Sequence, residues 1–290
     1  MNKVYSCVDG KSNTHAVIDW SAWAAQRLAI PLEFLHVLER HPERASTKDF
    51  SGAIGLGAQE SLLQDLSESD AKNSKTAQDA GRQLLANARE RASRMGVTRL
   101  DGRLRHGEFV STVQEMEADA QLFVLGEHYH AAQTAKIHFD HHVEQVIRSV
   151  KRSVLVATGE QFVQPKRFAI AFDGSTAAFK TVEMVKASPL LTGLTALVVM
   201  AGVESTLRVR QLEEARLALV KAGFTVQTQL IAGEPNEVLP AFLNERGEDL
   251  LVMGAFGHSW FRQLISGSTT STLLRVSDVP VLILRQVDFA

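Results

Sequence analysis

Short apolar runs alternate along the chain with longer segments in which apolar residues recur every three or four positions. The runs are typical of buried strands, and the longer spacing is typical of amphipathic helices. Five strands are predicted in the first half, starting at Val4, Leu32, Arg103, Leu122 and Ser153, and five in the second, starting at Phe168, Leu194, Gln229, Leu250 and Pro280. Because parallel neighbours need crossover helices, this alternation predicts parallel sheets covered on both faces.

The two halves repeat one pattern, since the first predicted strand of each ends in Asp-Gly, at Asp9 and at Asp173. We therefore predict two tandem doubly wound α/β domains with five-stranded parallel sheets, at residues 1–158 and 166–290. The polar stretch between them contains Gly159 and Pro165, as expected of a linker. This linker favours two domains over one continuous ten-stranded sheet.

The first half carries an insertion. Asp9 and Asp173 lie 164 positions apart, whereas Gly126 and Gly254 at the ends of the fourth strands lie 128 apart, which leaves 36 extra residues in the first half. They fall near residues 39–78, a segment with a glycine-rich stretch and a predicted amphipathic helix around residues 62–66. Long insertions are functional or disordered, so both a packed contact element and a solvated loop stay open.

A glycine pattern follows the fourth strand of the second half. Gly254 and Gly257 are followed after nine residues by Gly267-Ser268-Thr269, which opens a predicted helix. Ligands of open parallel sheets bind beyond the carboxyl ends of the strands, and a helix N-terminus offers free N–H groups to a phosphate. Each residue alone has a simpler explanation, such as a strand end or a helix cap. The sequence has neither a P-loop motif nor a dinucleotide-binding glycine motif.

With Asp173, this spaced motif and the ending Val279–Leu284, the chain resembles the universal stress protein family in its tandem form. The resemblance implies an adenine nucleotide alpha hydrolase-like fold for each half. It also implies ATP as ligand, with ADP or AMP as alternatives and Mg²⁺ as an accompanying ion. Asp173 would contact the adenosine end, and the glycines and hydroxyls would hold the phosphates. The expected binding residues are Ala171, Phe172, Asp173, Met200, Gly254, Gly257, His258, Gly267, Ser268 and Thr269.

The first half has lost most of this motif. Tyr129 replaces the second glycine, Phe139 or Asp140 replaces the third, and His141-His142 stand in place of the hydroxyl residues. A carboxylate would repel phosphate, so we expect no ATP in this half. The histidines of this region are candidate zinc ligands. No recognised zinc-ligand spacing is present, so we predict no metal site.

Composition narrows the functional classes. The chain has 290 residues and a formal net charge of -2, so nucleic acid is not an expected partner. The single cysteine, Cys7, excludes an internal disulfide and is expected to be a buried core residue. With no signal-peptide pattern and no apolar run long enough for a bilayer, we expect a cytoplasmic protein that does not enter membranes.

No set of catalytic residues is recognisable by spacing, so the leading hypothesis is an ATP-binding regulatory module of a stress response with an unidentified protein partner. The alternatives are a nucleotide-independent interaction protein and a slow ATP-hydrolysing enzyme, for which only His258 and Arg262 are candidates. The family resemblance further implies that the two halves pack through their fifth strands as a pseudo-dimer. A homodimer of the whole chain stays open.

Overall fold

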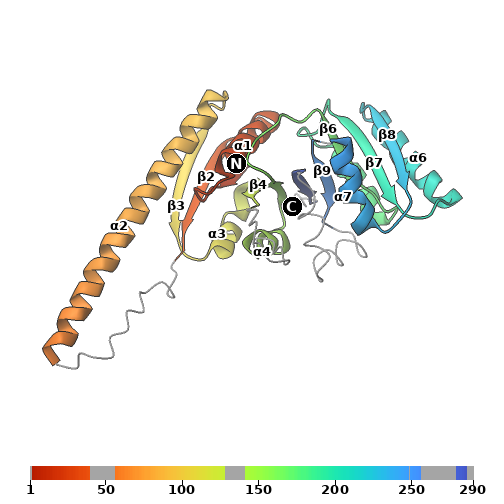
Figure 1. Ribbon diagram of the computed structural model, residues 1–290. Coiled ribbons are helices and arrows are strands. Elements are labelled where there is room, and N and C mark those ends of the chain that lie inside the picture. Colours follow the sequence, from red (N-terminus) through yellow and green to blue (C-terminus); the bar gives the residue numbers. More distant parts are fainter. Residues whose placement is uncertain (1, 40–55, 128–140, 248, 256–278, 286–290) are drawn as a thin grey trace.

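A computed structural model describes residues 2–39, 56–127, 141–247, 249–255 and 279–285 (Figure 1). The first half contains β1 (Lys3–Cys7), α1 (Thr14–Leu28), β2 (Leu32–Leu38), α2 (Leu56–Arg94), β3 (Leu100–His106), α3 (Phe109–Glu115), a 3-10 turn (Glu117–Asp119), β4 (Ala120–Gly126), α4 (His141–Ser149) and β5 (Ser153–Ala157). The second half contains β6 (Arg167–Ala171), α5 (Thr176–Lys186), β7 (Thr195–Ala201), α6 (Thr206–Lys221), β8 (Val226–Ile231), α7 (Pro235–Arg246), β9 (Leu251–Gly254) and β10 (Val281–Leu284).

The described strands form one ten-stranded sheet in the order β3-β2-β1-β4-β5-β10-β9-β6-β7-β8. Each half has the same internal order and is parallel throughout, which confirms the predicted α/β fold and its repeat. Glycines at equivalent turns repeat the same backbone geometry, with φ of 79° at Gly10 and 75° at Gly174. The domain limits at residues 158 and 166 stay a prediction.

The preference for two separate sheets was wrong. β5 and β10 pair antiparallel, with Leu155 opposite Leu282, and join the halves into one sheet. A fifth strand left at the edge would expose its unpaired N–H and C=O groups together with apolar side chains. Pairing the two edges removes both hazards, and the polar linker does not prevent it. The expected packing through the fifth strands is thereby confirmed.

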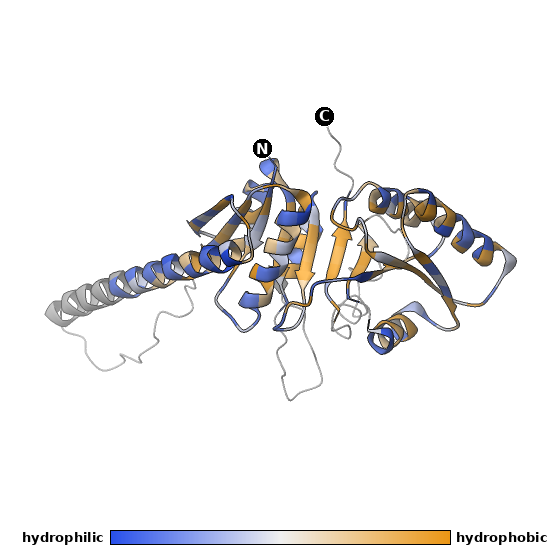
Figure 2. Cartoon of the chain, turned by 90° about the horizontal axis from the view of Figure 1, so that it is seen from above, coloured by the Kyte–Doolittle hydropathy of each residue, from blue (hydrophilic) through white to orange (hydrophobic). Residues whose placement is uncertain are grey.

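Two apolar cores lie on opposite faces of the sheet, and each contains residues of both halves. One core is formed with α1, α2, α5 and α6, and the other with α3, α4 and α7. Figure 2 shows the apolar strands at the centre of the molecule with helices on either side. The sheet is therefore doubly wound across its whole width.

Contacts outside the sheet also join the halves. The ring of Phe162 in the linker meets Trp20 of α1 edge-on at 4.9 Å between ring centroids. The Arg27 guanidinium, at the end of α1, donates to the Leu190 carbonyl at 3.1 Å and also to the Thr192 carbonyl. The linker and α1 thus hold the first half against the loop after α5.

The third strand of each half lies earlier than the sequence predicts. β3 (Leu100–His106) and β8 (Val226–Ile231) begin three residues before the predicted starts at Arg103 and Gln229, and both end before a glutamate, Glu108 or Glu234. Both glutamates are N-cap residues of the following helices. The glycines before them have positive φ, 144° at Gly107 and 127° at Gly233, so the backbone leaves the strand there.

Much of the insertion belongs to α2, a helix of 39 residues with a length of about 58 Å. The predicted helix around residues 62–66 is part of it, while residues 40–55 lie outside the described ranges. In α2 the buried positions Gly81, Leu85, Ala88 and Ala92 form one face toward β2 and β3. Figure 1 shows that the other end of α2 extends beyond the sheet. The insertion is thus partly helical, but the packed face of α2 begins at Gly81, after the insertion, and the side chains of residues 72–77 are exposed.

Within the ranges that the structure describes, no helix combines the length and the apolar character that a bilayer crossing requires.

Candidate functional site

The expected site in the second half lies at the carboxyl ends of β6, β7 and β9, where crossover loops of parallel strands leave a crevice. A small pocket of about 50 Å³ is present there. Its lining residues are Ala171, Phe172, Asp173, Ser175, Ala177, Ala178, Thr181, Ala201, Pro235, Leu239, Met253 and Gly254. Four of the residues expected from the sequence, Ala171, Phe172, Asp173 and Gly254, are therefore brought together.

Asp173 is held in place by the turn that follows β6. Its carboxylate accepts a hydrogen bond from the backbone N–H of Ser175 at 2.9 Å, and the Ser175 hydroxyl in turn caps α5 by accepting from Ala178 N–H at 3.1 Å. In the first half, Asp9 accepts from Lys11 N–H at 3.0 Å in the same way. The Asp-Gly turn thus positions an exposed carboxylate at the same place in both halves.

Gly254 ends β9 against α5, and its identity has a packing reason. A methyl group at this position would overlap the Thr181 hydroxyl, which is 2% exposed. Gly126 ends β4 in the same way, because a Cβ there would lie 2.7 Å from the Asn13 side-chain amide and 2.8 Å from Val17. Close packing of the strand on the helix therefore requires glycine in both halves, whatever the ligand.

The remaining expected residues are not part of this pocket as described. Met200 is 1% exposed and packs in the core, and its neighbour Ala201 lines the pocket. Gly257, His258, Gly267, Ser268 and Thr269 lie outside the described residues. The adenosine end of the expected site is therefore described, and the phosphate end is not.

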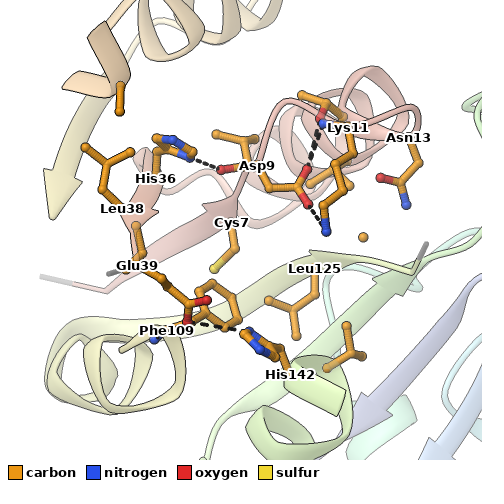
Figure 3. A pocket seen from close by; sticks show the side chains of 17 residues that line it. Cys7, Asp9, Lys11, Asn13, His36, Leu38, Glu39, Phe109, Leu125 and His142 are labelled. Carbon is orange, nitrogen blue, oxygen red and sulfur yellow. Dashed lines mark hydrogen bonds and ion pairs between the residues drawn. The ribbon is translucent and has the colours of Figure 1, made fainter. Parts of the chain in front are cut away.

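A larger pocket, of about 480 Å³, lies at the equivalent place in the first half (Figure 3). It is lined by Cys7, Val8, Asp9, Lys11, Asn13, Thr14, Val17, His36, Val37, Leu38, Glu39, Ala77, Phe109, Leu125, Gly126, His142 and Val143. These residues come from the carboxyl ends of β1, β2 and β4 and from the helices that cover them. The half that has lost the glycine motif thus contains the larger of the two pockets.

The charged side chains of this first-half pocket are bonded to one another. The Lys11 ammonium lies 3.3 Å from Asp9, and the Asp9 carboxylate also accepts from the Thr14 hydroxyl at 3.3 Å. The Glu39 carboxylate accepts from Phe109 N–H at 2.9 Å and lies 3.7 Å from His142 Nδ1. Figure 3 shows these pairs on opposite sides of the pocket.

The N-terminus of α3 beside this pocket is already capped by carboxylates. Glu108 accepts from Val110 N–H at 2.9 Å and from Ser111 N–H at 2.7 Å, in addition to the bond from Phe109 to Glu39. The Ser111 hydroxyl and these backbone N–H groups lower the pKa of Glu108. An anion would have to displace these carboxylates to reach the helix end.

His36 and Cys7 complete the wall of this first-half pocket. His36 binds the Val8 carbonyl through Nδ1 at 2.7 Å, as expected of a packed histidine. Cys7 is buried, which confirms its predicted place in the core, and burial raises the pKa of its thiol to about 12. A thiol with that pKa is neutral at physiological pH and adds to the apolar character of the wall.

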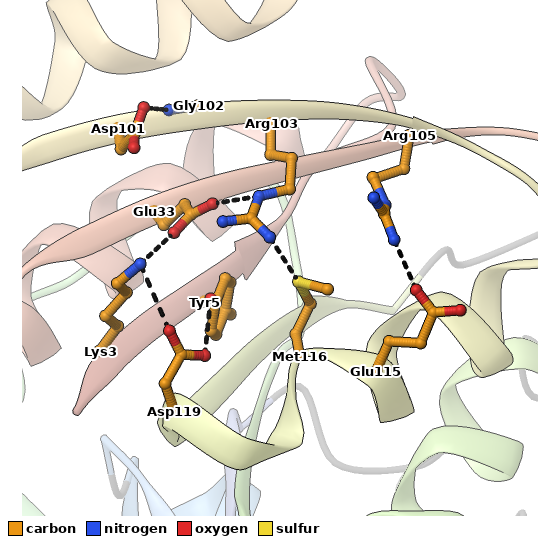
Figure 4. Close-up of polar contacts among 10 residues, drawn as sticks. All are labelled: Lys3, Tyr5, Glu33, Asp101, Gly102, Arg103, Arg105, Glu115, Met116 and Asp119. Carbon is orange, nitrogen blue, oxygen red and sulfur yellow. Dashed lines mark hydrogen bonds and ion pairs between the residues drawn. The ribbon is translucent and has the colours of Figure 1, made fainter. Parts of the chain in front are cut away.

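A second cluster of charged groups lies toward the amino ends of the strands (Figure 4). Glu33, 1% exposed, pairs with Lys3 at 2.7 Å and with Arg103 at 2.6 Å. Asp119 accepts from the Tyr5 hydroxyl at 2.8 Å and lies 3.4 Å from Lys3. Each acid in this cluster, Glu33 and Asp119, faces a cation or a hydroxyl group, so neither is left as an open binding group.

In the described ranges, no group of three or more histidine, cysteine or acidic residues could hold a metal ion. Of the histidines in this region, His128, His130 and His138 lie outside these ranges, the side chain of His141 is not described, and His142 lines the first-half pocket.

Comparison with known proteins identifies the family. The model of the universal stress protein family matches residues 1–158 and 185–285. The chain belongs to the universal stress protein family.

One curated member, the universal stress protein Slr1230 of a Synechocystis strain, is 29% identical over 288 residues, which is 98% of this chain and all of Slr1230. The crystal structure of a universal stress protein from Archaeoglobus fulgidus covers 100% of this chain and 98% of its own at 16% identity, with a TM-score of 0.69. A universal stress protein in complex with cAMP covers 42% of this chain and 98% of its own at 22% identity, with a TM-score of 0.36. The first two span the tandem arrangement from end to end.

The sequence pattern left several pocket residues unmarked. In the second half Thr181 was missed, since its role appears only from its contact with Gly254. In the first half Lys11 and Asn13 directly follow the Asp-Gly turn, and that position could have marked them. Glu39 and Phe109 had no such signal, because they are 70 positions apart and meet only in the fold.

Proposed function

We propose that the second half of this universal stress protein binds ATP, with ADP or AMP as alternatives and Mg²⁺ as an accompanying ion. The observation that carries the proposal is the crevice at the carboxyl ends of β6 and β9. There Ala171, Asp173 and Gly254 come together at the point where the motif ending in Gly267-Ser268-Thr269 begins. Carboxyl ends of parallel strands are where open α/β sheets bind ligands.

The second-half pocket is too small to hold a nucleotide as it stands. Its volume of about 50 Å³ is far below the roughly 300–1,000 Å³ of small-molecule sites. Nucleotide binding must therefore enlarge the space beside Asp173.

We further propose that the nucleotide serves regulation. No set of catalytic residues is recognisable by spacing in the sequence, which favours binding over phosphate chemistry. The nucleotide state would then govern contact with a protein partner in a cytoplasmic stress response. Slow hydrolysis and nucleotide-independent interaction are the competing functions, and the homodimer is untested.

Titration calorimetry with Mg-ATP on the full chain tests the proposal. We expect one binding event in the native protein and none in Gly267→Asp, because a carboxylate there would repel phosphate. Asp173→Asn should weaken binding, whereas its matched control Asp9→Asn, at the equivalent turn of the first half, should not. No heat with the native chain, or equal losses in the two asparagine variants, would refute the proposed site. ADP formed on prolonged incubation would favour the slow enzyme.

A further inference from the structure

The first-half pocket is a separate cavity whose ligand is not the one proposed for the second half. Its volume of about 480 Å³ lies within the range of small-molecule sites. Much of its wall is apolar, from Val8, Val17, Val37, Leu38 and Leu125. Apolar walls with a few placed polar groups are typical of such sites.

Aromatic rings form one side of this pocket. Phe109 of α3 and His142 of α4 stack with ring centroids 5.7 Å apart and 27° between the planes. Figure 3 shows the two rings next to each other, facing the side of the pocket formed by His36 and Asp9. Aromatic side chains favour contact with a flat ring in a ligand.

The electrostatics of the pocket disfavour phosphate. Two carboxylates, Asp9 and Glu39, face one ammonium group, Lys11, which already pairs with Asp9 at 3.3 Å. The first N–H of α3 is bonded to Glu39 and the next two to Glu108. A phosphate would have to break these bonds and approach the carboxylates, and each change is unfavourable.

We propose that the first half binds an uncharged, ring-containing small molecule in this pocket, and that its own carboxylates exclude phosphorylated ligands. The apolar wall supplies the binding area, and the stacked Phe109 and His142 rings meet the ring of the ligand. The ion pairs fix the shape of the polar end of the pocket and are not its anion-binding groups.

Two alanines of α2 give a matched pair of variants for the test. Ala77 lines the pocket and Ala80 does not, yet both are exposed and lie three residues apart on one helix. Ala77→Trp should place an indole in the mouth of the pocket, whereas Ala80→Trp should leave the pocket open. Because both sites are exposed, both variants should keep the circular dichroism and melting temperature of the native chain.

The probe is Nile red, an uncharged ring dye whose fluorescence rises in apolar surroundings, titrated into the full chain. We expect saturable binding of one dye per chain to the native protein and to Ala80→Trp, with affinity at least about tenfold lower for Ala77→Trp. Sodium tripolyphosphate should not compete with the dye. No saturable binding, or equal affinity in all three proteins, would overturn the proposal.

ATP gives the decisive second measurement. If ATP displaces the dye, or if Ala77→Trp abolishes ATP binding while Asp173→Asn does not, the first half is a nucleotide site and the proposal is wrong. Failure of ATP to bind at all would refute the site proposed for the second half and leave the dye result unchanged, so the two failures are distinguishable.

Discussion

Single residues at the strand ends serve packing before they serve chemistry. Gly254 belongs to the glycine motif, yet a side chain there would overlap Thr181. Gly126 has the same role against Asn13 and Val17 in the half that lost the motif. A glycine in a binding motif is therefore weaker evidence for a ligand when a neighbouring helix already requires it.

Cys7 should react slowly with iodoacetamide in the folded chain. Burial, and then the nearby Asp9 charge, raise the pKa of its thiol to about 12, and only the thiolate is nucleophilic. The thiolate fraction, and with it the rate, should therefore rise about tenfold per pH unit from pH 7 to pH 10. The chain in guanidinium should instead level off near pH 9, as an ordinary thiol does. A plateau near pH 9 in the folded chain would contradict the raised pKa.

At the scale of elements, local pattern predicted the strands well and their ends less well. The third strands end early because glycines with positive φ turn the backbone there, and Glu108 and Glu234 then occupy the N-cap positions of the following helices. For helix α2, local pattern could not predict the contacts that attach the helix to the rest of the fold. Its attachment depends on the Arg91 guanidinium, which meets both Asp19 carboxylate oxygens at 2.6 Å, a pair 72 positions apart in sequence.

Gly81→Ala in α2 should destabilise the chain although alanine is the better helix former by about 1 kcal/mol. Its Cβ would lie 2.8 Å from Leu104 Cδ1 and 2.9 Å from His36 Cδ2. Leu104 can rotate, but His36 is held by the Val8 carbonyl. Overpacking of this kind costs about 1–3 kcal/mol, so we expect a net loss of up to about 2 kcal/mol in urea unfolding.

The exposed Ala80 supplies the reference for this comparison, because Ala80→Gly should lose about 1 kcal/mol from helix propensity alone. If Gly81→Ala instead gains stability by that amount, the contact with His36 carries no cost.

At the scale of the whole molecule, the β5–β10 pair makes two repeats one structural unit. Leu155 and Leu282 face each other across the junction and are fully buried, and both cores contain residues of the two halves. The halves are also joined by the Arg27 guanidinium of α1, which donates to the Leu190 and Thr192 carbonyls of the second half. A substitution that destabilises the junction should therefore lower the stability of both halves.

Scanning calorimetry of the native chain should accordingly show one unfolding transition, with equal calorimetric and van't Hoff enthalpies. Leu282→Lys buries an unpaired ammonium at the junction and should split or broaden this transition. Val203→Lys, at a position 76% exposed, is the control and should change neither its shape nor its midpoint. Two transitions in the native chain would mean that the halves unfold independently.

The sequence by itself determined the class of fold, the repeat of one α/β pattern in the two halves and the burial of Cys7. These properties depend on local periodicity and on the similarity of the two halves, which a linear pattern records. Only the tertiary structure decided that the halves share one sheet, that Glu33 is buried between Lys3 and Arg103, and that, of the two pockets at the carboxyl ends of the strands, the one in the degenerate half is larger. Those outcomes depend on contacts between positions far apart in the chain, where shape and charge complementarity decide and periodicity carries no information.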